Sequence, residues 1–506
     1  MPERPLILAL DQGTTSSRAV AVDSTGAMIA TTQQPFEQLF PDDGWVEHRP
    51  DDIWQTTLSS ARTVLKQVSE EQLGDVVSLG ITNQRETVLI WNRATGQPVC
   101  NALVWQDRRT AEVCRDLFER GHQDMIRAKT GLLLDPYFSA SKIAWILDHV
   151  DGARAAAERG ELAFGTVDTF LIWKLTSGQS HLTDETNASR TSLFNIYTGE
   201  WDQELLDLFN IPAALLPKVQ TSSSDFGMTD PAILGRSLPI HAVAGDQQSA
   251  AFGQGCVNPG MTKATYGTGC FVLVNTGTKA VLSSNQLLTT RACRIGHEPV
   301  FALEGSIFIA GAVAQWLRDE LNLVATSAET EPVAAGNSDN GGVYLVPAFT
   351  GLGAPHWNSE ARGAIFGLTR QSNRADIVRA AIESVAYQTH DLVAALKADG
   401  VVPDLIRTDG GMAANSWLMQ FLASITGISL QRAASLETTA LGVAYLAGLK
   451  SGVWQHIDEV KDLAGPYQSF SPDMPEDVRA ALLREWDIAV QTTQFRAKMQ
   501  SESKAL

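Results

Sequence analysis

Two segments of the chain, about half its length apart, share the same order of apolar and polar positions. Residues 6–10 are apolar, residues 11–18 (DQGTTSSR) are polar or glycine, and residues 19–22 are again apolar. The order returns in the second half, where YGTGC at 266–270 precedes the apolar run 271–274. Apolar runs joined by a short glycine-containing segment are typical of a β-hairpin. The pattern therefore predicts a strand, a tight Gly-Thr turn and a return strand in each half.

The two predicted turns have the composition of a phosphate-binding loop. Glycine permits a sharp bend, and successive backbone N–H groups in such a turn form a nest for an anion. Hydroxyl side chains accompany them at Thr14, Thr15, Ser16 and Thr268. Neither G-x-G-x-x-G nor G-x-x-x-x-G-K-[ST] occurs at a strand–helix junction, which argues against a Rossmann crevice or a P-loop. Two such turns predict a polyphosphate clamped between two related domains.

The remaining pattern predicts an α/β fold. Apolar runs at 76–81, 240–244 and 405–408 each end in a polar loop, as buried strands do, and apolar residues recur at helical spacing in 141–147 and 380–396. Strands that alternate with helices indicate an α/β architecture, and the hairpins add antiparallel strands, so we expect mixed sheets. A chain of 506 residues is too long for one hydrophobic core. We place the domain boundary near residue 254, between domains 1–253 and 254–506.

Charge and composition exclude several classes of partner. A net charge of −18 argues against nucleic acid and anionic membranes, because both favour a basic surface. No apolar stretch approaches the ~20 residues of a membrane helix, and Asp11 interrupts the N-terminal apolar run, so it is not a secretory signal. The five cysteines form no C-x-x-C pair, which indicates reduced thiols. We therefore expect a cytoplasmic protein.

Two aspartates that follow predicted strands each have two interpretations. Asp11 directly precedes the first turn, where its side chain either caps that turn or faces bound phosphates through a magnesium ion, by way of water because Mg²⁺ dehydrates reluctantly. Asp246 follows the strand 240–244 and precedes a helical segment. It is either the N-cap of that helix or a general base that accepts the proton of a substrate hydroxyl during phosphoryl transfer.

Arg85 and Glu86 are adjacent opposite charges at the end of the strand 76–81. One interpretation is a solvated surface pair. The strand is apolar enough to be internal, however, so its end is expected to open into a cleft. A donor fork beside an acceptor suits a small polyol, whose hydroxyls both donate and accept hydrogen bonds.

Other candidate residues are aromatic or lie in a glycine-rich turn. Tyr137 follows Asp135-Pro136, and the proline makes that loop rigid. Trp105 and Phe271 are by default core aromatics. The segment DGGMAAN at 409–415 is either a plain loop and helix start or a turn that a flat base or a ribose approaches closely.

Taken together, these segments resemble the FGGY family of carbohydrate kinases, within the actin, Hsp70 and hexokinase superfamily, and within it the members that phosphorylate glycerol. The resemblance runs from about residue 6 to 452. The motifs that carry it are GWVEH (44–48), GITNQRET (80–87), DPYFS (135–139), TD (183–184) with TNASRT (186–191), AGDQQ (244–248), YGTGCF (266–271), PAFTGLGAP (347–355) and GAIFGLT (363–369). It implies two RNase-H-like, actin-like ATPase domains with mixed sheets flanking a central nucleotide cleft.

The resemblance also implies roles for individual residues. By position, the family's glycerol-binding set corresponds to Arg85, Glu86, Tyr137, Asp246 and Gln247, with Trp105 and Phe271 as the apolar wall. The nucleotide contacts correspond to Thr14, Thr15, Ser16, Arg18, Thr268, Gly311, Gln315, Gly411 and Asn415. Asp11 corresponds to the magnesium-site carboxylate, and Asp246 to the catalytic base.

The implied activity is ATP- and Mg²⁺-dependent phosphorylation of glycerol to glycerol 3-phosphate. The resemblance leaves open whether the chain forms a homo-oligomer, either a dimer or a tetramer. Two alternatives are a kinase for a longer polyol or a ketose and an ATP-gated, actin-like binding protein without phosphoryl transfer. The Arg-Glu pair, Tyr137 and the tandem Asp-Gln argue against the first alternative. The carboxylate of Asp246 argues against the second.

Some bacterial members of the family are inhibited by fructose 1,6-bisphosphate through a glycine-rich loop that ends in arginine. Here the corresponding segment, 229–236, keeps Arg236 but has one glycine. Pro231 lacks an N–H donor and Asp230 repels phosphate. We therefore expect little sensitivity to the bisphosphate.

Overall fold

Both predicted Gly-Thr hairpins form in the computed structural model, which describes residues 4–434, 437–463 and 465–504. Strand β1 (Pro5–Gln12) pairs antiparallel with β2 (Ser16–Asp23) across the turn 13–15, where the Gly13 N–H donates to the Ser16 carbonyl at 2.9 Å. In the second half, β14 (Met261–Tyr266) pairs in the same way with β15 (Cys270–Gly277) across the turn 267–269. The hairpin prediction is confirmed.

Each hairpin lies inside a mixed sheet. The first sheet has the order β13 (Ile240–Gly245), β5 (Asp75–Asn83), β1, β2 and β3 (Met28–Pro35). The second has the order β16 (Leu288–Arg291), β17 (Phe301–Ile307), β15, β14, β20 (Leu405–Asp409), β21 (Leu430–Ala433) and β22 (Tyr467–Phe470). In both sheets the first hairpin strand is also parallel to a later strand, β1 to β5 and β14 to β20. The expected mixed α/β architecture is confirmed.

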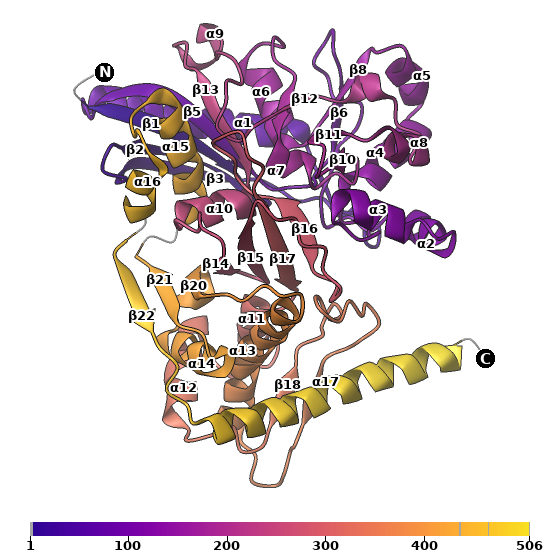
Figure 1. Ribbon diagram of the computed structural model, residues 1–506, viewed down its shortest axis with the longest axis vertical. Coiled ribbons are helices and arrows are strands. Elements are labelled where there is room, and N and C mark those ends of the chain that lie inside the picture. Colours follow the sequence, from indigo (N-terminus) through magenta and orange to yellow (C-terminus); the bar gives the residue numbers. More distant parts are fainter. Residues whose placement is uncertain (1–3, 435–436, 464, 505–506) are drawn as a thin grey trace.

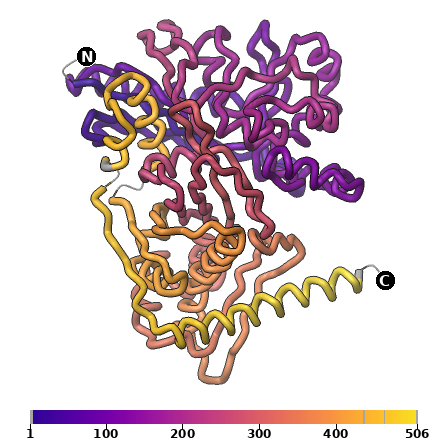
Figure 2. Tube along the Cα trace, viewed as in Figure 1, coloured from indigo at the N-terminus to yellow at the C-terminus, as the bar shows by residue number. Residues whose placement is uncertain are grey.

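One face of the first sheet is covered by helices of the first half alone, and the other by one helix from each half of the chain (Figure 1). Helices α1 (Pro50–Glu70) and α6 (Val167–Leu175) pack on one face. On the other face lie α10 (Asp246–Gly253) and α15 (Thr438–Ser451), which share a core with Ile7 and Val20. The Cα trace shows the same interleaving, because the orange-yellow segment that contains α15 lies among the indigo N-terminal strands (Figure 2). The first half therefore depends on a helix that the second half supplies.

The second sheet is covered mainly by α13 (Arg374–Ala398), α14 (Ser416–Thr426), α11 (Gly311–Asp319) and α17 (Glu476–Lys504). Helix α13 contains the predicted helical segment 380–396, and it begins with a capping box in which Asn373 and Asp376 satisfy each other's backbone N–H groups. The same half contains β18 (Tyr344–Val346), β19 (Ala364–Phe366), α12 (Thr330–Gly336) and α16 (Ile457–Leu463), with 3₁₀ turns η2 (Ser327–Glu329) and η3 (Gly411–Ala414).

Part of the first half forms a separate apolar cluster beside its sheet. Helix α4 (Ser139–His149) belongs to it and contains the predicted segment 141–147. The remaining elements of the first half, inside and outside this cluster, are β4 (Glu47–His48), β6 (Leu89–Asn92), β7 (Ala102–Leu103), α2 (Ala111–Glu119), α3 (Gln123–Thr130), α5 (Ala153–Glu158), β8 (Leu162–Gly165), β9 (Leu182–Asp184), α7 (Glu185–Ala188), β10 (Phe194–Asn195), β11 (Glu200–Trp201), α8 (Gln203–Leu208), η1 (Ala213–Leu215), β12 (Lys218–Gln220) and α9 (Pro231–Leu234).

All five cysteines are free thiols, as the sequence predicts. Within the described ranges, no helix is both long enough and apolar enough to cross a membrane.

Candidate functional site

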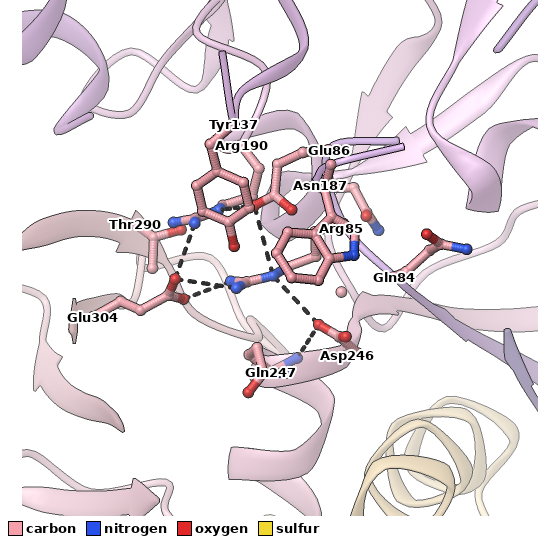
Figure 3. A network of polar contacts seen from close by, with 12 residues as sticks. Gln84, Arg85, Glu86, Tyr137, Asn187, Arg190, Asp246, Gln247, Thr290 and Glu304 are labelled. Atoms are coloured by element: carbon pink, nitrogen blue, oxygen red, sulfur yellow. Dashed lines mark hydrogen bonds and ion pairs between the residues drawn. The ribbon is translucent and has the colours of Figure 1, made fainter. Parts of the chain in front are cut away.

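Parallel pairing of β5 with β13 brings Arg85, Glu86 and Asp246 to one edge of the first sheet. The carboxyl ends of parallel strands meet at the same edge, and there Arg85 Nε lies 3.3 Å from Asp246 Oδ1 (Figure 3). Arg85 is only 3% exposed and Glu86 1%. The alternative of a solvated surface pair is therefore wrong, and Glu86 also has a left-handed φ of 63°, a strained conformation that is enriched at functional sites.

Asp246 is the first residue of α10 and does not cap it, since Gly245 occupies the N-cap position. Its Oδ1 accepts the N–H of Gln247 at 2.7 Å, and its side chain keeps 28% exposure. Burial raises the pKa of Asp246, and the nearby cations Arg85 and Lys263 oppose that rise. The structure thus presents a reachable carboxylate with a perturbed pKa, as a general base requires.

Three aromatic rings from separate segments stand over this edge. Trp105 lies edge-on to Tyr137 with ring centroids 5.6 Å apart and edge-on to Phe271 at 6.4 Å. Phe271 comes from β15 in the second half. The Trp105 Nε1–H also donates to Thr14 Oγ1 at 3.0 Å. The default assignment of Trp105 and Phe271 to the core is wrong, because both are only half-buried and together they wall the site up to the first Gly-Thr turn.

The first turn and the end of β1 hold the predicted phosphate-side residues. Thr15 is exposed, and Thr14 and Ser16 are half-buried. Burial raises the pKa of Asp11 to about 6; Arg18 opposes that rise and the negative charge of Asp246 adds to it. Arg18 itself reaches into the second half, where it forms an ion pair with Glu437.

The residues of the second half that the resemblance assigns to the nucleotide lie around the second turn and on the helices that follow it. The Gly311 N–H donates to the Gly267 carbonyl at 2.9 Å, and a Cβ at position 311 would lie 2.4 Å from that oxygen. Thr268 and Gly411 are exposed, and Gly411 has no atom within 4 Å of where its Cβ would be. Asn415 caps α14 through its Oδ1, while its buried Nδ2 has no hydrogen-bond partner. An orphaned buried donor beside open backbone fits a ligand. Gln315 is exposed on α11.

The fit of a magnesium ion can be judged from Asp11. A desolvated carboxylate that faces a second carboxylate is stabilised by a divalent cation, and Mg²⁺ uses one or two protein carboxylates with water and substrate phosphates completing its shell. In the described part of the chain, no three His, Cys, Asp or Glu side chains gather as a metal cage. Asp11 fits such a sparse site.

Sequence reasoning missed three charged residues at the site: Arg190, Lys263 and Glu304. Each is fully buried. Lys263 on β14 donates to Gln247 Oε1, and the other two contact Arg85 or Glu86 (Figure 3). A signal was present, because Lys263 and Glu304 interrupt otherwise uncharged strands, and a buried charge needs a partner.

Comparison with known proteins places this geometry in a family. The model for the FGGY family of carbohydrate kinases, N-terminal domain, matches residues 6–253, and the C-terminal domain model matches 262–451. A glycerol kinase of Rhodospirillum centenum is 57% identical over 98% of this chain and 100% of its own length. Glycerol kinase 1 of Pseudomonas aeruginosa is 52% identical over 97% of this chain and 99% of its own. The crystal structure of Plasmodium falciparum glycerol kinase with ADP superposes with a TM-score of 0.93 at 36% identity, covering 97% of this chain and 98% of that one.

Proposed function

Because the chain belongs to the FGGY family of carbohydrate kinases, we propose that it transfers the γ-phosphate of ATP to a terminal hydroxyl of glycerol. The relatives named glycerol kinase match it along nearly its whole length. The observation that carries the proposal is the position of Asp246, whose carboxylate lies 3.3 Å from Arg85 Nε and remains reachable between the two Gly-Thr turns and the aromatic wall.

Glycerol binds through paired donors and acceptors against an apolar wall. Arg85 donates and Glu86 accepts, which suits hydroxyls that do both. The carbon chain lies against Trp105 and Phe271, and Tyr137 and Gln247 complete the hydrogen-bonding set. A buried polar set of this kind rejects substrates that leave its members unpaired.

Phosphoryl transfer then depends mainly on positioning and charge stabilisation. Asp246 accepts the proton of the terminal hydroxyl as that oxygen attacks the γ-phosphorus in line, and the bond from this phosphorus to the β,γ-bridging oxygen breaks, so that ADP leaves. The backbone N–H groups of the turns 13–15 and 267–269 hold the phosphate oxygens, as nests do. Asp11 would hold a magnesium ion, which would neutralise part of the phosphate charge. Gly311, Gly411, Gln315 and Asn415 hold the nucleoside, with the halves closed to exclude water.

The test is a coupled assay with ATP, Mg²⁺ and a panel of glycerol, erythritol, xylitol and xylulose. The proposal expects the highest kcat/KM for glycerol and no turnover without Mg²⁺. A preference for a longer polyol or a ketose would make the chain a different kinase of the same family. ATP binding without any phosphorylated product would point to an ATP-gated binding protein instead.

A further inference from the structure

Glu304 joins the two arginines of the polyol pocket from the opposite half of the molecule. Its Oε2 accepts from Arg85 Nη1 at 2.6 Å and its Oε1 from Arg85 Nη2 at 3.1 Å. The same Oε1 accepts from Arg190 Nη2 at 2.9 Å. Glu304 lies on β17, whereas both arginines belong to the first half. Figure 3 shows the carboxylate facing both guanidinium groups.

The charges alternate along a continuous chain of contacts. Arg190 Nε donates to Glu86 Oε1 at 2.6 Å, and Arg85 Nε faces Asp246. The guanidinium of Arg190 also lies over the Tyr137 ring, 5.5 Å from its centroid. Glu304 is therefore in contact, directly or through one arginine, with Arg85, Glu86 and Tyr137, which are proposed to bind glycerol.

The bidentate pair leaves Arg85 little freedom. Its Nη1 and Nη2 are both used by Glu304, and Nη1 also donates to Gln248 at 3.2 Å. Its Nε and the second N–H of Nη2 remain for other partners, and Nε lies 3.3 Å from Asp246 Oδ1 on the side proposed for the polyol. A fork–fork pair fixes the plane of a guanidinium as well as its position. Without Glu304 the two buried cations would share only Glu86, whose Oε1 lies 2.6 Å from Arg190 Nε and 3.8 Å from Arg85 Nε.

We propose that Glu304 is the positioning residue of the polyol pocket, which orients Arg85 and Arg190 from the second half and completes the pocket only when the two halves are docked. The proposal rests on the proposed function. It assigns Glu304 no contact with substrate, so its effects must pass through the arginines.

The first test is Glu304→Gln, which keeps the shape and removes the charge. We expect kcat/KM for glycerol to fall about 10- to 100-fold, the range for losing a residue that orients a ligating side chain, mostly through KM for glycerol. KM for ATP should change by about threefold or less, because uniform substrate binding is lost only on the polyol side. Glu304→Asp keeps the charge on a shorter side chain and should recover part of the loss.

A double-mutant cycle separates positioning from a general structural role. If Glu304 acts through Arg85, adding Glu304→Gln to Arg85→Ala lowers kcat/KM far less than it does in the wild-type background. The matched control is Glu383→Gln, which removes a buried carboxylate that pairs with Arg379 in the same half, away from the pocket. It should leave KM for glycerol unchanged.

The outcomes are distinguishable. The positioning role of Glu304 would be overturned if Glu304→Gln lowered kcat/KM by the same factor with Arg85 present and with Arg85→Ala. Equal changes in the KM values for glycerol and ATP would also overturn it. If Glu304→Gln does not fold, the cycle is run with Glu304→Asp and the same criteria apply. A wild-type protein that does not phosphorylate glycerol would refute the proposed function instead.

Discussion

At the scale of single residues, the proposed function depends on two carboxylates, Asp246 and Asp11, whose pKa values burial raises. The two residues end neighbouring parts of one sheet edge. Arg85 and Lys263 partly oppose the rise for Asp246, and Arg18 partly opposes it for Asp11. Because burial and the nearby cations act in opposite directions on the pKa, both side chains remain suited to their proposed roles. Asp246 accepts a proton and Asp11 accepts a cation.

Asp246→Asn should leave a folded protein that binds ATP and glycerol but turns over slowly. An amide keeps the shape and cannot accept the hydroxyl proton, so kcat should fall about 10²- to 10⁴-fold, the usual contribution of a general base. Steady-state kinetics for both substrates measure it. Near wild-type turnover would remove Asp246 from the mechanism.

The raised pKa of Asp11 predicts a pH-dependent requirement for magnesium. Below about 6 the carboxyl becomes protonated, and a proton competes with the cation. The magnesium concentration for half-maximal rate should therefore rise as pH falls from 7.5 to 5.5 in the wild type. Asp11→Asn is the control and should need high magnesium at both values. The same pH dependence in both proteins would assign it to the nucleotide rather than to Asp11.

At the scale of elements, α10 is held in place by glycines. A Cβ on Gly442 of α15 would lie 1.8 Å from the Ser249 carbonyl of α10, and a Cβ on Gly253 would lie 2.0 Å from the Thr438 carbonyl. The two helices therefore cross backbone to backbone. Because Asp246 begins α10, this close crossing also sets the position of the proposed base.

Gly442→Ala should lower the free energy of unfolding by about 1–3 kcal/mol, the usual cost of overpacking, and should lower kcat as α10 shifts. Gly336→Ala is the control, since its Cβ meets no atom within 4 Å at an exposed helical position. Denaturant unfolding compares the two. Equal stability of both variants would mean that the helices separate without cost.

The short helix α9 lies within the segment 229–236, which corresponds in sequence to the bisphosphate-binding loop of some bacterial members of the family. The Asp230 side chain accepts from the Ala232 N–H at 2.8 Å and from Ser177 Oγ at 2.5 Å, so its charge already occupies the start of the helix. We expect fructose 1,6-bisphosphate at millimolar levels to leave the initial rate nearly unchanged, at subsaturating glycerol and several enzyme concentrations. Inhibition that disappears in Arg236→Ala would show that one arginine suffices.

At the scale of the whole molecule, the halves share both a core and a charge cluster. Helix α15 covers Ile7 and Val20 of the first sheet, and Glu304 reaches from the second half to Arg85. The domain boundary near residue 254 stays a prediction. Because the two halves share a core, a fragment that ends at this boundary lacks α15, and this can be tested.

A fragment of residues 1–253 should not unfold cooperatively, because without α15 only α10 would cover one face of its sheet and the rest of that face would be exposed. Adding residues 438–463 through a flexible linker should restore a sigmoidal urea transition and reduce binding of an apolar dye. A cooperative transition in the fragment alone would contradict the expected dependence on α15.

The sequence by itself determined the local structure around the two Gly-Thr turns and at several strand ends. Apolar runs around Gly-Thr turns predict hairpins because the side-chain alternation of a strand and the freedom of glycine act over a few residues. The same local logic places Asp11, Arg85 and Asp246 at strand ends. The patterns also predict the strands 76–81, 240–244 and 405–408, whereas Gln247, Gly311 and Gln315 enter the proposed site only through the family resemblance.

Only the tertiary structure decided which distant residues meet. Arg85 and Glu304 are 219 positions apart, and no periodicity connects them. Asp246 does not cap α10, because Gly245 has the extended backbone of the N-cap position. Trp105 lines the site rather than the core, because the fold places its ring beside Tyr137 and Phe271 from distant segments. Such pairings are chosen by burial, because a charge excluded from water must find its partner wherever the fold brings one within reach.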